Sequence, residues 1–292
     1  MTAAEETAAP TLTYVFAVCR RDAPAAPMGL PGLGAGAPVR ALPAGRLTAV
    51  VQDVPAADFA EEALRERLSD RDQLERCARA HHEVITAVSA VAPAVPLPLA
   101  TLYRGDERAR DALREKEESF LATLDRIAGR AEWGVKVYAL AGQPAAREAT
   151  APAATSSGAA HEATAPAATS SGAAHEATAP AAASSGLAYL ERVRNQHKGR
   201  EQRQNAALRA AERVDAVVRG LAVATRRLRP HGPEVTGPHR THVLNAAYLI
   251  DHGRERQLRA ALASLREDET AVRIELSGPW APYSFADGGT AP

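Results

Sequence analysis

The chain has 292 residues, enough for two ordinary domains, and 35 Lys and Arg balance 35 Asp and Glu to a formal net charge of zero. This neutrality argues against bulk electrostatic capture of nucleic acid or of an anionic membrane, and no apolar run approaches the roughly 18 residues of a spanning helix. Cys19 and Cys77 are too few for a disulfide framework, and the acidic, Ala-rich Met1–Pro10 has no signal-peptide pattern, so we expect a cytoplasmic protein.

Residues 11–142 predict an N-terminal α+β domain after a disordered start over residues 1–10. Thr11–Val18 is rich in β-branched and aromatic residues and predicts the first strand. A Gly- and Pro-rich loop, Gly29–Pro38, precedes two short apolar runs, Val39–Leu42 and Leu47–Val51. The Pro43-Ala-Gly45 segment between these runs predicts a β-hairpin.

Two helices and a last strand are predicted in the rest of this domain. Apolar residues recur at spacings of three and four over Asp70–Val91 and predict a helix with this inner face: Leu74, Cys77, His81, Val84, Val88 and Val91. Prolines then break the pattern, and Leu97–Leu102 is interpreted as a strand. Asp106–Gly129 predicts a second helix that ends at its glycine. Trp133–Leu140 alternates and is interpreted as the strand that closes the domain, with Val135 on one face.

A tandem repeat separates this domain from the rest of the chain. Its 14-residue unit reads EATAPAATSSGAAH in Glu148–His161, recurs identically in Glu162–His175 and begins again at Glu176. The small and polar residues of the unit cannot bury enough apolar surface to offset the entropy of ordering, and a solenoid repeat would need large apolar residues. We therefore interpret residues 143–186 as a disordered linker.

The longest helical pattern, residues 187–228, differs between its two halves. The second half carries a sustained apolar face: Ala207, Ala210, Val214, Val217, Leu221, Ala224 and Leu228. Asn195–Asn205 is polar all round and contains Gly199, so the first half is predicted to project into solvent or to await a partner.

The C-terminal domain, residues 187–286, continues after a loop over Pro230–Pro238. Thr241–Ile250 and Ala271–Leu276 predict strands on either side of a helix over Gly253–Glu267, and residues 287–292 are predicted to be a disordered tail. Both halves of the chain thus end in a helix followed by a strand. We predict an α+β protein with two domains of ferredoxin-like, split βαβ character, the second reduced and carrying the long helical arm.

Residues 191–229 hold eleven Lys and Arg against four Asp and Glu, although the whole chain is neutral. Three interpretations stay open. The first is a solvated helix face, and the second is a docking surface for an acidic partner that would use Arg192, Arg194, Lys198 and Arg200. The third is nucleic-acid binding, which is weakened because this segment has no turn-helix pattern, no stacking aromatics and no zinc module. A membrane surface is disfavoured because no bulky apolar stripe opposes the cations of the first half.

The end of the chain concentrates aromatic residues within six positions: Trp280, Tyr283 and Phe285. Gly278 and Pro279 are predicted to stop the last strand, and Pro282 to hold the following run extended. We expect this segment to pack back onto the body of the protein or onto a partner. It could therefore be a latch that closes the C-terminal domain or a contact surface.

No constellation supports catalysis, a cofactor or a metal ion. Gly29–Gly36 lacks the GK[ST] ending of a phosphate loop and precedes a strand rather than a helix. Cys77 and His81 stand four apart on the predicted helix, but no second pair has zinc-ligand spacing, which favours a buried core role for His81. His239 and His242 carry an equally weak metal signal. The alternatives are a cytoplasmic enzyme with an unrecognised site between the domains and, less favoured, a basic-helix nucleic-acid binder.

Motifs in both domains resemble the gas vesicle protein F/L family. They are Thr13–Val18, the helix with His81-His82 followed by Ala94–Leu99, Leu124–Val137 with Trp133 and Val135, Val243–Ile250 with Asn245 and Tyr248, and Ser277–Phe285. Ala100–Tyr103 departs from the family's usual Phe-Gly-Thr. The resemblance implies two α+β domains, no catalytic role, no cofactor, and a part in assembling gas vesicles, the gas-filled protein shells of some prokaryotes. It implies two kinds of partner: the small, hydrophobic main shell protein and other gas vesicle accessory proteins. It also implies association with the vesicle shell.

Overall fold

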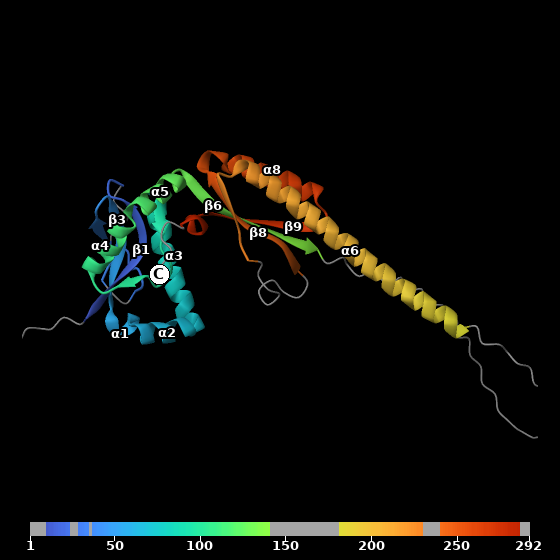
Figure 1. Cartoon of the computed structure of the whole chain (residues 1–292), viewed down its shortest axis with the longest axis horizontal. Helices are drawn as coiled ribbons and strands as arrows, with labels where there is room; N and C mark the ends of the chain where they lie inside the picture. The colour runs from blue at the N-terminus through green and yellow to red at the C-terminus, as the bar shows by residue number, and fades with distance from the viewer. Residues whose placement is uncertain (1–9, 24–28, 35–36, 141–180, 230–239, 287–292) are drawn as a thin grey trace, which may run out of the picture.

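A computed structural model describes residues 10–23, 29–34, 37–140, 181–229 and 240–286 (Figure 1). The segments predicted to be disordered at both ends of the chain, the predicted loop after residue 229 and the linker as far as residue 180 lie outside the described residues. The described part is an α+β structure with two sheets, and each pairing between its strands is antiparallel.

The first sheet consists of β1 (Thr11–Arg20), β2 (Arg40–Ala44), β3 (Leu47–Pro55), β4 (Ala94–Pro96) and β5 (Leu102–Tyr103). Its order is β2-β3-β1-β4, and β5 also pairs with β1. The predicted hairpin is confirmed, because β2 and β3 pair through a turn in which Gly45 has a φ of 60°. The prediction of a strand over Leu97–Leu102 is wrong. Pairing ends at Pro96 and resumes at Leu102, because Ala100, with a φ of 66°, turns the chain between them.

Three helices follow β3: α1 (Ala56–Phe59), α2 (Glu61–Ser69) and α3 (Arg71–Ser89). The helix α3 was predicted, and it begins where the Asp70 side chain accepts a hydrogen bond from the Gln73 N–H at 2.8 Å. Leu74 and Val91 were expected on its inner face but are 37% and 47% exposed. The helix α2 has no buried residue and therefore shows no apolar periodicity, which explains why it was not predicted.

The single helix expected over residues 106–129 is two helices, α4 (Asp106–Glu115) and α5 (Glu117–Ile127). Lys116 separates them, because its φ of −107° and ψ of 15° are not helical. Each helix still buries an apolar face against the first sheet, with Leu113 in α4 and Leu124 in α5.

The second sheet consists of β6 (Arg130–Leu140), β7 (Ala224–Arg227), β8 (Arg240–Asp251) and β9 (Val272–Trp280). Its order is β7-β8-β6-β9. The expectation that Trp133–Leu140 closes the first sheet is therefore wrong, because β6 pairs with β8 and β9. The short strand β7 was expected to be part of the long helix. We propose that the chain divides between α5 and β6 rather than at residue 142. We name the part before this boundary, with the first sheet, the first unit, and the part after it, with the second sheet, the second unit.

Two helices cover one face of the second sheet: α6 (Ala181–Leu221) and α8 (Glu255–Asp268), which follows the 3-10 turn η1 (His252–Arg254). The strand β8 explains how the two units join. Its Ala246, Tyr248 and Ile250 pack toward α6 and α8, whereas Ala247 and Leu249 belong to the core that contains α5. Since alternate residues of a strand face opposite sides, this continuous apolar run is buried on both faces.

The helix α6 begins at Ala181, inside the third repeat copy, and extends well past the end of the second sheet (Figure 1). Its inner half packs on that sheet through a face that comprises Ala207, Ala210, Ala211, Val214 and Val218. Two residues that were predicted to lie on the inward apolar face, Val217 and Leu228, are 39% and 37% exposed. The projection of the outer half is confirmed, because the described side chains from 189 to 205 are exposed or half-buried.

Candidate interaction site at the junction of the two sheets

The strand β9 continues through Gly278 and Pro279 to Trp280, so the expected strand stop is wrong. Trp280 pairs with Glu132 across a register shift. Proline is compatible with this place because β9 is an edge strand, where a missing N–H leaves no ladder bond unmade. Gly278 has a φ of 123°, and a Cβ there would lie 2.8 Å from the Glu132 carbonyl oxygen. Glycine is therefore required for this close approach.

The segment after β9 folds back onto the first unit, as predicted, but it is not extended. Tyr283–Phe285 forms a 3-10 turn, η2, and the Phe285 ring is buried in the core with α5 and β8. Trp280 and Tyr283 remain 45% and 37% exposed. The two roles left open by the sequence thus separate: Phe285 has the position of a latch, and the other two aromatics lie at the surface.

The surface aromatics lie against His82 of α3. The His82 Nδ1 is 3.1 Å from the Tyr283 hydroxyl, and their rings stack with centroids 5.9 Å apart. The Trp280 ring lies 5.6 Å from the His82 ring. We name these three residues the aromatic triad. It joins a helix of the first unit to the end of the second.

Polar contacts from both units hold the η2 turn. Glu132 accepts hydrogen bonds from the Ser284 N–H at 2.7 Å and from the Ser284 hydroxyl at 2.6 Å. Arg126 donates to the Phe285 carbonyl at 2.6 Å, and Arg226 donates to the Ser284 carbonyl at 2.8 Å. Burial raises the pKa of Glu132, and the hydrogen bonds from Ser284 oppose that rise. The turn is therefore fixed from α5, β6 and β7 at once.

A groove of about 300 Å³ runs beside Trp280 between the two units. We name it the inter-unit groove. Its lining is mostly apolar and comes from the end of α3, from β4, from the α5–β6 junction and from the segment 279–282, with Trp280, Pro282 and Ile127 among its walls. Volume and lining suit one or two apolar side chains of a partner.

A larger cavity of about 530 Å³ lies within the first unit, between the 97–103 loop and the junction of α4 with α5. Leu99, Leu113 and Phe120 line it together with Lys116. The Ala100 N–H donates to the buried Tyr14 hydroxyl at 2.9 Å, which holds the loop in its left-handed turn.

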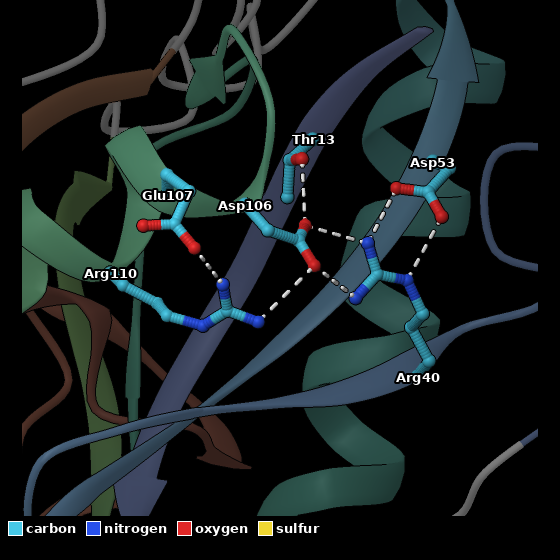
Figure 2. Close-up of polar contacts among 6 residues, drawn as sticks. All are labelled: Thr13, Arg40, Asp53, Asp106, Glu107 and Arg110. Carbon is cyan, nitrogen blue, oxygen red and sulfur yellow. Dashed lines mark hydrogen bonds and ion pairs between the residues drawn. The ribbon is translucent and has the colours of Figure 1, made fainter.

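The start of α4 is anchored to the first sheet by charged residues that the sequence analysis did not single out (Figure 2). Arg40 contacts Asp53 at 2.6 and 2.9 Å and Asp106 at 2.7 and 3.0 Å, and Thr13 donates to Asp106 at 3.0 Å. Hydrogen bonding to Arg40 holds the pKa of Asp106 below its usual range. Figure 2 shows the Arg40 fork turned toward both carboxylates, so this cluster positions α4 against the first sheet.

Four predicted site residues are core residues of the second unit. Trp133 and Val135 are buried on the face toward α6 and α8, and the Arg259 guanidinium lies 5.0 Å from the Trp133 ring. Tyr248 donates to the buried Asp215 of α6 at 2.6 Å, and the Asn245 amide donates to the Arg229 carbonyl at 2.8 Å. Their positions are structural. On the projecting part of α6, the four predicted cations are exposed: Arg192, Arg194, Lys198 and Arg200.

Two features weighed for chemistry, His81 and the Gly-rich loop, have structural positions, and His239 lies outside the described residues. His81 is a buried core residue, as predicted, with Nδ1 2.9 Å from the Tyr14 hydroxyl and Nε2 3.1 Å from the Leu97 carbonyl. Burial lowers the pKa of His81 to about 4. The Gly-rich loop is held by Gln52, whose amide accepts from the Leu33 N–H at 2.9 Å and donates to the carbonyl of Ala37 at 2.8 Å.

Within the part of the chain that the structure describes, no group of three or more His, Cys, Asp or Glu could hold a metal ion. The same residues include no helix with the length and apolar character of a membrane span.

Comparison with known proteins gives consistent results at the level of sequence. The family model for gas vesicle synthesis protein GvpL/GvpF matches residues 12–287. Gas vesicle protein L of Streptomyces sp. (strain CB03234) is 38% identical over 277 residues, which cover 94% of this chain and 92% of that protein. Gas vesicle protein F of the same strain is 26% identical over 287 residues, which cover 94% and 99%.

Solved structures share the fold. The crystal structure of the gas vesicle protein GvpF from Anabaena sp. PCC7120 has a TM-score of 0.59 at 14% identity, with 94% of this chain and 96% of that chain covered. The crystal structure of GvpF from Microcystis aeruginosa has a TM-score of 0.57 at 16% identity, with 94% and 98% covered.

Proposed function

This chain belongs to the gas vesicle synthesis protein GvpL/GvpF family, and from that membership we propose that it holds the small, hydrophobic shell protein of gas vesicles before the subunit enters the growing shell. The accessory role in gas vesicle formation follows from the family. The contact with the shell protein, association with the vesicle shell and contacts with other accessory proteins are the proposal.

The observation that carries the proposal is the exposed aromatic pair beside the inter-unit groove. Trp280 and Tyr283 keep 45% and 37% of their surface exposed, although η2 is fixed by four hydrogen bonds. Val91, at the end of α3, is 47% exposed between two residues that line the same groove. Exposed apolar surface at the junction of two units is typical of a binding site.

A shell subunit has a matching need. Before it polymerises, such a subunit exposes apolar surface and strand edges, and species of this kind aggregate unless they are covered. A groove that is wide enough for one or two apolar side chains, and that both units line, can shield part of that surface and release it again.

We also propose that each unit is a variant of the split βαβ arrangement. In the second sheet the spatial order β7-β8-β6-β9, with α6 and α8 as the two crossovers, supports this proposal. In the first sheet the order β2-β3-β1-β4 supports the same arrangement. The connection from β1 to β2, which would be the first crossover, has no helix in its described residues.

An L-type role is proposed in preference to an F-type role. The chain is 38% identical to gas vesicle protein L and 26% identical to gas vesicle protein F of the same strain. A non-catalytic role is proposed as well. The pKa values of Tyr14, His81 and Tyr248 are strongly shifted, and these are buried, hydrogen-bonded core groups. Burial also raises the pKa of Tyr283 in the aromatic triad to about 12, and none of these four residues lines the groove.

Co-expression with the main gas vesicle shell protein, followed by affinity purification, tests the proposal. The wild-type chain should co-purify with soluble shell protein, and a Trp280→Ala, Tyr283→Ala double variant should lose most of it. A Leu208→Ala, Val217→Ala double variant is the matched control, because these two α6 side chains are 42% and 39% exposed and do not line the groove. No co-purification with the wild type, or equal retention by the double variant and the control, contradicts the proposal.

A further inference from the structure

The outer half of α6, residues 189–206, projects past the end of the second sheet (Figure 1). We name it the arm. Its described side chains are exposed or half-buried, and it contains Gly199, which weakens an unsupported helix relative to alanine. Most helices in proteins take their stability from the packing of one face. The arm has no such packing among the described residues.

The face that the inner half of α6 buries continues without interruption along the arm. Ala207, Ala210 and Val214 pack on the second sheet at spacings of three and four. The same alternation, continued outward, names five arm residues: Arg203, Arg200, Gln196, Val193 and Tyr189. Residues at this alternating spacing of three and four lie on one face of a helix, as the core positions of a coiled coil do, but only Tyr189 and Val193 of the five are apolar. We name these five residues the seam.

The seam cations have no acidic neighbour on their own helix. Arg200 has Gln196, His197, Arg203 and Gln204 at the positions three and four away, and Arg203 has Gly199, Arg200, Ala206 and Ala207. On the opposite face, Arg194 has Glu191 and Lys198 has Glu201 three residues away. Internal ion pairs are thus available to the off-seam cations and not to the seam cations.

Ion pairs elsewhere on α6 show the contrast. Arg213 pairs with Glu269 at 2.6 Å, and Arg219 pairs with Asp215 at 2.8 Å. Between described residues, no ion pair includes any of the five Lys and Arg of the arm. The arm itself carries two Glu against these five cations. The arm is therefore a positively charged segment on a neutral chain.

We propose that the seam binds an acidic amphipathic helix of a partner protein. Apolar residues of that helix pack against Tyr189 and Val193, and its carboxylates pair with Arg200 and Arg203 at the neighbouring seam positions. Charge complementarity selects this partner, because charged residues at seam positions specify which helix pairs and in which register. A second copy of the arm is a poor partner, because it offers the same positive charge.

The nature of the surface also argues for a helix rather than for nucleic acid. The cations lie on both sides of the arm, whereas a backbone-tracking surface gathers them on one side. This inference does not depend on which protein the inter-unit groove holds, and it is tested without the shell protein.

The test uses the full-length chain and a labelled synthetic peptide of about four heptads, with Leu at the two core positions and Glu at the flanking positions. Its counterpart carries Lys in place of Glu. Fluorescence anisotropy at roughly 0.1 M salt, where the Debye length is about 10 Å, should show binding of the acidic peptide and none of the basic one.

Two double variants with the same change in charge separate the seam from the rest of the arm. R200E/R203E should weaken binding of the acidic peptide roughly tenfold or more, and R194E/K198E should stay within about threefold of wild type, since only the first pair lies on the seam. Circular dichroism melts confirm folding, and R200Q/R203Q replaces the first variant if its melt changes.

Three results would overturn the inference. One is an equal loss of binding in both double variants, which is the behaviour of diffuse positive charge. The second is binding of about 20 base pairs of duplex DNA, or of phosphatidylserine vesicles, as tight as that of the acidic peptide at the same salt. The third is self-association in sedimentation that R200E/R203E abolishes, which would assign the seam to a second copy.

Discussion

Replacement of Phe285 by alanine should destabilise the protein far more than replacement of Trp280, although both residues belong to the aromatic C-terminal segment 280–285. The Phe285 ring is 6% exposed and packs in the core that contains Leu121, Leu124 and Leu249. Truncation of a buried Phe costs about 3–5 kcal/mol, from lost transfer energy and from the cavity left behind. Trp280 is 45% exposed, so we expect about 1–2 kcal/mol for Trp280→Ala.

Thermal melts followed by circular dichroism, together with urea titrations, measure the difference. For a chain of this size 1 kcal/mol shifts the midpoint by about 2–4 °C, so Phe285→Ala should lower it by roughly 6–20 °C. Phe285→Leu is the control and should lose about 1.5 kcal/mol or less, because it keeps most of the volume. Equal destabilisation by Phe285→Ala and Trp280→Ala, or an unchanged midpoint for Phe285→Ala, would refute the assignment of Phe285 as the latch.

Three further predictions follow from single contacts. Ala100→Gly relieves a left-handed residue that costs about 1–2 kcal/mol, and added freedom in the unfolded chain offsets about 0.5–1 kcal/mol of that gain. Urea titration should therefore show a net gain of up to about 1.5 kcal/mol, and a clear loss would contradict this. Arg40→Lys should lose about 1–2 kcal/mol at pH 7, after allowance for partial exposure. Because the folded pKa of Asp106 is depressed, this loss should shrink as pH falls below its unfolded value of about 3.9, and a pH-independent difference would argue against it. The folded pKa of Glu132 is raised, so the stability that its protonated carboxyl contributes is present below pH about 4.3 and is lost as pH rises through the folded pKa. Glu132→Gln should therefore flatten the dependence of unfolding free energy on pH between about pH 4 and 7. Parallel pH profiles for wild type and variant would show that Glu132 does not cause this dependence.

Local pattern was sufficient for much of the secondary structure. The strand β1, the β2–β3 hairpin, α3, α8 and β8 were all predicted within a few residues, because each shows a clear period of apolar residues or a turn signal. The helix α2 was missed because it buries nothing, and the helix break at Lys116 was missed because the apolar period continues across it. Local period does not record a break of this kind.

Assignment of a strand to its sheet was beyond local pattern. The alternation in β6 predicts a strand, but it does not identify the partner strands, and β6 pairs with residues that lie at least 100 positions later in the chain. The same holds for the polar anchors. Arg40 and Asp106 are far apart in sequence, and single charged residues carry no periodic signal. The aromatic cluster was found from composition alone, whereas its division into a buried Phe285 and an exposed Trp280 required the structure.

A photo-crosslinking amino acid at Val91 tests the central claim most directly. Val91 is 47% exposed between two residues that line the inter-unit groove, and Leu208 of α6, 42% exposed, is the control position. Upon co-expression with the main shell protein and irradiation, the account predicts a covalent adduct with the shell protein from position 91 and none from position 208. Co-purification of the shell protein without any adduct from position 91, or equal adducts from both positions, would contradict it.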